Sequence, residues 1–257
     1  MPTILPEAFA LRGTETGAGY CRGMCTVVIR VPEPGQGPVR VLAVRDEDPE
    51  RPWLPWGAWW PDRPSVRGVR DVLAGGAWLA ADGSRLAVLL NRAGGADVTV
   101  PTSRGSLVLD AVAGRPLPEP LTTLGFNLVE AQPAGARVTS WEGGHPRVID
   151  LTPGTHMVAH EDVDDPTTPR IAEWLGPFAT TPTDDRGDGR WWEGWLRVLG
   201  ESARLEAADD RAIIRDNRPH GFPTLSLLVA VASLDASGIR VSTDALARPG
   251  RWNRPRL

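Results

Sequence analysis

Cys25 is the residue of this chain whose type and position could perform the most specific chemistry. It directly follows Met24, and removal of the chain up to that methionine would leave Cys25 with a free α-amino group. Such an amine has a pKa of about 8, so a fraction of it is neutral near physiological pH and can accept the thiol proton. Nucleophile and general base would then belong to one residue, which predicts attack of Cys25 on a carbonyl carbon.

Two further side chains could complete this centre. Asp46 ends the strand expected to pair with the Cys25 strand, where its carboxylate would orient the amine. Asn91 ends a later strand, where its amide would donate to the oxyanion of a tetrahedral intermediate. We predict Cys25, Asp46 and Asn91 as catalytic residues. The structural alternatives are a buried apolar cysteine, a solvated loop carboxylate and a turn-forming asparagine.

His156 and His160 raise the alternative of a metal site. On a helix their spacing would place both on one face, but a strand followed by a loop is expected here. The sequence contains no His-Glu-x-x-His pattern, and a third ligand is not evident. We therefore predict no metal site and no cofactor, while haem ligation by one of the four histidines stays open as an alternative.

The elements expected around these residues are mostly strands in hairpins. Runs of β-branched and apolar residues predict strands at 24–31, 39–44, 78–81, 86–90, 126–132, 137–141, 147–151, 224–231 and 239–242. Helices are predicted at 103–112, with a serine cap, at 169–175 and at 190–205. Residues 45–64 are rich in Pro and Trp and predict a loop. This order indicates an α+β fold of antiparallel sheets and not a βαβ array.

Composition narrows the function classes. All 28 basic residues are arginine and the net charge is −4, so lysine Schiff-base chemistry is excluded and nucleic acid is not an expected partner. Two cysteines, Cys21 and Cys25, cannot build a four-thiolate zinc site. No apolar run reaches about 18 residues and no signal peptide is recognisable, so we expect no membrane span and a cytoplasmic location.

The first residues set a separate question. Residues 1–23 show no sustained periodicity and are expected to be a disordered or non-native extension, with residues 24–257 forming one domain. Three explanations stay open: a mis-assigned start, processing before Cys25, or a retained extension that blocks the amine. Only the first two would leave Cys25 with its own base.

Several blocks of sequence stand in a fixed order along residues 24–241. They are Met24-Cys25, Val44-Arg45-Asp46-Glu47, Arg51-Pro52, Gly75-Gly76-Ala77-Trp78-Leu79-Ala80, Ser103-Arg104-Gly105-Ser106-Leu107-Val108, Gly125-Phe126-Asn127-Leu128-Val129 and Leu151-Thr152-Pro153-Gly154-Thr155. In order and spacing these blocks resemble the NRDE family, also called the transport and Golgi organization protein 2 family.

The resemblance implies a relation to the N-terminal-nucleophile cysteine hydrolases, and with it an αββα sandwich of antiparallel sheets. It implies hydrolysis of non-peptide C–N bonds in a small-molecule amide substrate, with Arg45 and His160 as substrate-binding candidates. Eukaryotic members are associated with Golgi organisation and with haem or lipid handling. The alternative function is therefore a non-catalytic carrier or trafficking protein for haem or a lipid-like ligand.

Three positions depart from the pattern that the resemblance sets. Val44 stands where the family motif has Asn, and His160 stands where the hydrolases place a functional Asn. Pro223 stands where the hydrolases use an active-site Arg, and proline cannot supply a cationic donor. We therefore expect a partly degenerate active site.

Overall fold

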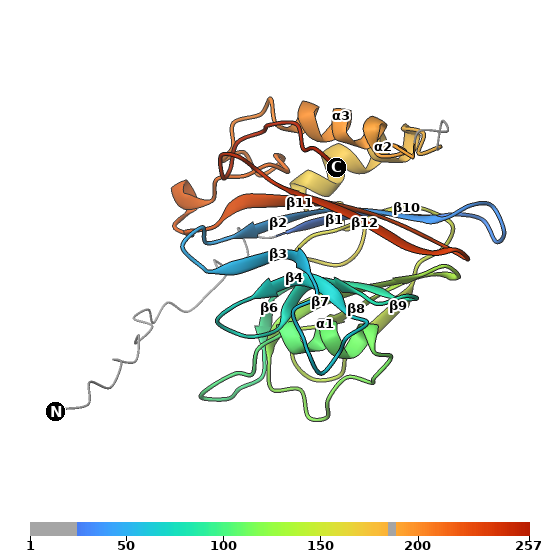
Figure 1. The fold of residues 1–257 in the computed structure, drawn as a ribbon. Coiled ribbons are helices and arrows are strands. Elements are labelled where there is room, and N and C mark those ends of the chain that lie inside the picture. Colours follow the sequence, from blue (N-terminus) through green and yellow to red (C-terminus); the bar gives the residue numbers. More distant parts are fainter. Residues whose placement is uncertain (1–24, 185–188) are drawn as a thin grey trace.

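Two antiparallel sheets form the centre of the computed structural model, which describes residues 25–184 and 189–257 (Figure 1). The predicted extension at residues 1–23 lies outside the described residues. The first sheet has the order β10 (Gly154–Val158), β1 (Thr26–Val31), β2 (Val39–Glu47), β11 (Leu225–Asp235) and β12 (Gly238–Ala245). The second has the order β3 (Trp53–Gly57), β4 (Arg67–Asp71), β5 (Ala77–Ala81), β6 (Leu86–Gly95), β7 (Leu124–Gln132), β8 (Gly135–Trp141) and β9 (Arg147–Asp150). The predicted α+β class with antiparallel sheets is confirmed.

Helices cover the outer face of each sheet. Figure 1 shows α2 (Pro169–Thr180) and α3 (Glu193–Ser202) above the five-stranded sheet and α1 (Gly105–Val112) below the seven-stranded sheet. A short 3-10 helix, η1 (Arg218–His220), precedes β11. The described chain is therefore arranged in four layers: helices, sheet, sheet and helix. None of the helices in the described ranges has the length and hydropathy needed to cross a membrane.

The alternation of side chains along β1 shows how the sequence builds these layers. Val27 and Ile29 are buried in the apolar core between the two sheets. Val28 is buried in a second core, between the first sheet and α2 and α3. A third core lies between the second sheet and α1. Strand β1 is apolar on both faces because both of its faces are covered.

The prediction of a loop over residues 45–64 is wrong in two places. Strand β2 continues as far as Glu47, and β3 forms an edge strand that pairs with β4. Pro55 lies inside β3, which an edge strand tolerates because the missing N–H can face away from the ladder. Strand β4 was not predicted because Arg67–Asp71 contains one strongly apolar residue, Val69.

The predicted helix at 103–112 is confirmed, but its cap differs from the prediction. Helix α1 begins at Gly105 with Arg104 as the N-cap residue. The Ser103 hydroxyl instead accepts a hydrogen bond from the Gly105 N–H at 3.2 Å. Backbone packing explains the start: a Cβ atom on Gly76 would lie 2.4 Å from the Gly105 carbonyl carbon. Two glycines therefore let the start of α1 approach the start of β5, which positions Arg104.

Asn127 joins the two sheets from inside the core. Its side chain is fully buried on β7, and Nδ2 donates to the Ala159 carbonyl at 3.0 Å and to the Glu161 carbonyl at 2.7 Å. Those carbonyls belong to the segment that directly follows β10 of the other sheet. An apolar residue here would leave one buried and one partly buried carbonyl without this donor.

We expect Asn127→Leu to lower the free energy of unfolding by about 3 kcal/mol, because two carbonyl groups lose their donor. Denaturant titration of the variant would measure this change. Gln132→Leu, at an exposed position of the same strand, is the matched control and should stay within about 0.5 kcal/mol of the parent. Equal effects of the two substitutions would contradict the assigned role of Asn127.

Candidate active site

Cys25 lies directly before β1 and contacts the backbone of Asp46. The Asp46 N–H donates to Sγ at 3.4 Å, and the thiol is directed to the Asp46 carbonyl at 3.7 Å. The cause is the β1–β2 hairpin, in which Thr26 pairs with Val44. The structure therefore brings Cys25 and Asp46 together, although the contact is through the backbone of Asp46.

The side chains of Cys25 and Asp46 belong to opposite faces of the first sheet. Cys25 packs in the core between the sheets. Asp46 is two residues from Val44, which faces the helices, so its carboxylate lies on that same face. Its Oδ1 accepts a hydrogen bond from the Ser226 hydroxyl at 2.6 Å. Its Oδ2 is buried and has no hydrogen-bond partner among the described residues. On the same face, Arg170 of α2 donates from Nη1 to the Thr26 hydroxyl at 3.0 Å.

Burial controls the protonation of both residues. Burial raises the pKa of Asp46 to about 6, against the opposing effects of the Arg170 guanidinium and the Ser226 hydrogen bond. The pKa of the Cys25 thiol is raised to about 12, mainly by burial and secondly by the charge of Asp46. In the intact chain the thiol is therefore protonated near neutral pH, and a thiolate needs a base at hand.

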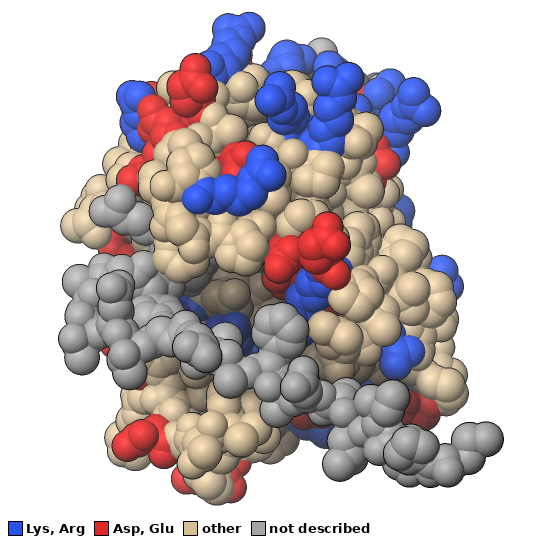
Figure 2. All heavy atoms as spheres, turned by 90° about the vertical axis from the view of Figure 1, so that its left-hand side faces the viewer, with Lys and Arg blue, Asp and Glu red and all other residues tan. Residues whose placement is uncertain are grey.

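A cavity of about 380 Å³ opens beside Cys25. Among the predicted residues, Cys25, Arg45, Asp46 and Asn91 line it. Sequence reasoning did not find the other chemically active lining residues, which are Glu47, Arg51, Asp71, Trp78 and Arg104. Figure 2 looks onto the end of the molecule at which β1 begins; this face is hollowed, and arginine side chains show inside the hollow. Because the chain contains no lysine, every basic group of the cavity is a guanidinium.

His160 does not line this cavity. The pKa of His160 is lowered to about 4, mainly by burial and secondly by the charges of Arg170 and Arg215. Its ring is therefore neutral. The structure thus places His160 near the arginines of the helix-facing side. His156 is held by the Asp164 carboxylate at 2.6 Å and the Thr152 carbonyl at 2.9 Å. Within residues 25–184 and 189–257, no group of three or more His, Cys, Asp or Glu side chains could hold a metal ion.

Two buried arginines near Asp46 were also missed from the sequence. Arg170 and Arg215 are almost fully buried, and both charges act on the Asp46 carboxyl. Arg215 is held at Nε by the Asn217 side chain and at Nη2 by the Asp210 carboxylate. Arg170 comes from α2 and Arg215 from the segment before η1, both far from Asp46 in the sequence. Only the three-dimensional fold brings them near Asp46.

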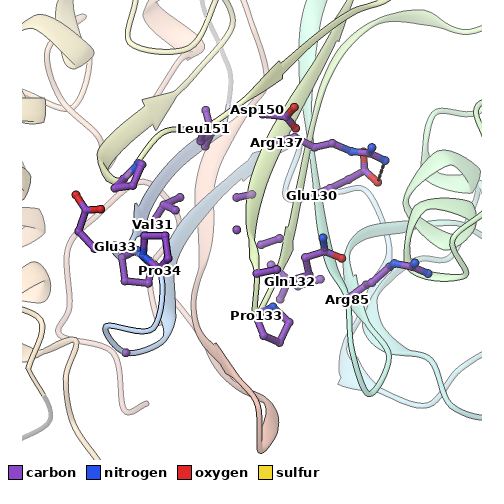
Figure 3. A pocket seen from close by; sticks show the side chains of 18 of the residues that line it. Val31, Glu33, Pro34, Arg85, Glu130, Gln132, Pro133, Arg137, Asp150 and Leu151 are labelled. Carbon is purple, nitrogen blue, oxygen red and sulfur yellow. Dashed lines mark hydrogen bonds and ion pairs between the residues drawn. The ribbon is translucent and has the colours of Figure 1, made fainter.

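A second cavity, of about 700 Å³, lies at the opposite end of β1 (Figure 3). Val31, the last residue of β1, lines it together with Leu86, Ala131 and Leu151, which give it an apolar wall. The ion pair between Arg137 and Glu130, at 2.9 Å, lies at its edge. Both cavities therefore combine apolar and charged side chains, but only the first one has the cysteine in its wall.

The fold and site define a four-layered α+β protein with a buried cysteine at the head of a central strand. A family model described as Transport and Golgi organisation 2 matches residues 24–169, which is more than half of the chain. The chain belongs to this family. The matched range contains Cys25, Asp46, Asn91 and Arg104. A comparison with curated proteins found no significant match.

The raised pKa of Asp46 predicts a pH dependence of stability. Between pH 3.8 and about 6 the carboxyl is protonated in the folded state and ionised in the unfolded state, so stability falls as the pH rises through this window. Relative to Asp46→Asn, which cannot ionise and keeps an oxygen for Ser226, the parent should lose about 2 kcal/mol between pH 4 and 7.

Denaturant titrations of the parent and of Asp46→Asn at a series of pH values would measure this difference. Glu33→Gln, at an exposed position of the β1–β2 turn, is the matched control and should follow the parent curve. Parallel curves for the parent and for Asp46→Asn would show that the Asp46 carboxyl titrates alike in the folded and unfolded states.

Proposed function

We propose that this protein hydrolyses non-peptide amide bonds, with Cys25 as an N-terminal nucleophile once the preceding residues have been removed. The observation that carries the proposal is the position of the sulfur: it lies at the head of a central strand, in the wall of a cavity that Arg45 and Asn91 also line. On this proposal the four layers are those of the N-terminal-nucleophile hydrolases.

The reaction follows from the two groups that Cys25 would then carry. The neutral α-amine takes the thiol proton, and the sulfur forms a bond to the amide carbonyl carbon. The tetrahedral intermediate collapses when the C–N bond breaks, and the protonated amine of Cys25 gives its proton to the leaving nitrogen. Water then adds to the thioester carbonyl carbon and its proton passes to the α-amine. The C–S bond breaks, the amine returns the proton to the sulfur, and the acid and the free thiol are released.

Asp46 and Asn91 take the supporting roles in this proposal. Oδ2 of Asp46 is the buried acceptor without a donor among the described residues, and the freed amine would donate to it. Asn91 lines the cavity from the outer part of β6, where its side chain is exposed and free to donate to the oxyanion. With residue 24 attached, Cys25 has an amide nitrogen and no base, so the proposal requires cleavage.

We expect the thiol of Cys25 to become reactive only after the chain before it is removed. In a Cys21→Ser background Cys25 is the sole thiol. A pKa of about 12 leaves the thiol of the full chain protonated at pH 8, so its alkylation by iodoacetamide, followed by mass spectrometry, should be at least about 100-fold slower than in protein cut before Cys25.

The same cut protein should hydrolyse chromogenic amides, and Cys25→Ala should abolish this activity while its melting temperature stays near that of the parent. Cys25→Ser is the conservative control and should retain a trace of turnover. Equal alkylation rates before and after cleavage, or amide hydrolysis that survives Cys25→Ala, would refute the assignment of the nucleophile.

A carrier function for an apolar ligand is the second candidate, and the apolar side chains that line one part of the second cavity favour it. Val31, Leu86 and Leu151 would contact such a ligand in the second cavity, and Glu130 and Arg137, which also line it, could contact a polar end of the ligand. Haem or a fatty acid should then raise the melting temperature of Cys25→Ala as much as that of the parent. Ala136→Trp, which fills the second cavity, should remove the shift; a shift that survives this substitution would exclude the cavity.

A further inference from the structure

Hydrogen-bond donors without acceptors gather around the Cys25 cavity. Arg45 is 3% exposed, and its Nη1 is buried without a hydrogen-bond partner among the described residues. Nε1 of Trp78 is also buried without a hydrogen-bond partner among the described residues. Both residues line the cavity. Buried donors in this state carry a desolvation penalty, which a bound acceptor group would relieve.

The charges of the cavity leave an excess of one positive charge. Arg45, Arg51 and Arg104 line it, against the carboxylates of Glu47 and Asp71, since the Asp46 carboxylate is turned to the helix side. Asp71 is held by Arg51 at 2.6 Å, and Glu47 contacts Nη2 of Arg45 at 3.4 Å. The guanidinium of Arg104 has no carboxylate partner among the described side chains, and its hydrogen bond goes to a backbone carbonyl.

Arg104 is held in place before any ligand binds. Nη1 donates to the Gly125 carbonyl at 2.8 Å, at the start of β7. The Gly76–Gly105 contact fixes the backbone next to it. Burial lowers the pKa of the Arg104 guanidinium, and the charge of the nearby Glu47 carboxylate opposes that effect. Little side-chain entropy is then lost when a ligand binds.

From these contacts we propose that Arg45 and Arg104, with the indole N–H of Trp78, bind a carboxylate of the substrate close to Cys25. The proposal rests on the hydrolase function above and names its substrate class: amides that carry a carboxylate next to the scissile bond, such as N-acyl amino acids. A carboxylate accepts hydrogen bonds only and matches the planar guanidinium fork. As a monoanion it neutralises the single excess charge, whereas a phosphate dianion would overcompensate it.

Binding is tested on the full chain carrying Cys25→Ala, so that the readout does not depend on catalysis. Calorimetry with N-hexanoylglycine, N-hexanoylglycinamide and the phosphate ester of N-hexanoylethanolamine compares carboxylate, neutral and dianionic forms of one scaffold. We expect the carboxylate to bind roughly 10- to 100-fold more tightly than the amide and more tightly than the phosphate ester. Arg104→Met should remove that preference. Arg63→Met is the matched control, because Arg63 also donates to a backbone carbonyl, that of Leu109, outside the cavity, and should keep it.

Equal affinity for the acid and the amide, absence of binding by both, or a preference that survives Arg104→Met would overturn the proposal. In the cut protein, Arg45→Met should lower kcat/KM for the acid more than for the amide, and an equal loss on both substrates would assign Arg45 to the oxyanion instead. Carboxylate-selective binding without hydrolysis by the cut parent would support this inference and refute the hydrolase. Hydrolysis of acid and amide at equal rates would support the hydrolase and refute the carboxylate site.

Discussion

The buried carboxylate of Asp46 is the constraint on which the arrangement of the site depends. A carboxylate taken out of water costs several kcal/mol unless hydrogen bonds and opposite charge compensate it. Ser226 supplies the hydrogen bond at 2.6 Å, and its oxygen also accepts the backbone N–H of Arg215 at 2.8 Å. Arg170 and Arg215 supply the charge. One side chain of β2 is thereby tied to β11, to α2 and to the segment before η1.

This network also decides what the opposite face of the sheet presents. Successive residues of a strand point to opposite faces, and a slip of one residue would exchange them. With Asp46 fixed on the helix side, Arg45 and Glu47 must face the second sheet, beside Cys25. The contacts of Asp46 on the helix side therefore agree with the apolar alternation of β2, and both place Arg45 and Glu47 on the side of the cavity.

Local signals in the sequence were sufficient for most of the strands and for the closeness of Cys25 to Asp46. A Pro- and Gly-rich turn between two β-branched runs predicts a hairpin, and a hairpin fixes which residues pair. Strand β3 was missed because Pro55 and the tryptophans around it resemble a loop. Arg104 could not be assigned from its own segment: its position depends on the contact of Gly76 with Gly105, which joins two separate blocks. The expectation for His160 rested on the resemblance alone, and long-range packing places its ring with Arg170 and Arg215 instead.

Strand β1 separates two environments that a single ligand cannot occupy together. Its six residues span about 20 Å, with Cys25 at one end and Val31 in the wall of the second cavity at the other. The interior between them is packed with aliphatic side chains from both sheets, and such interiors transmit displacement poorly unless an element has two discrete arrangements. Chemistry at Cys25 and occupation of the far cavity are therefore expected to be independent, so that loss of one leaves the other intact.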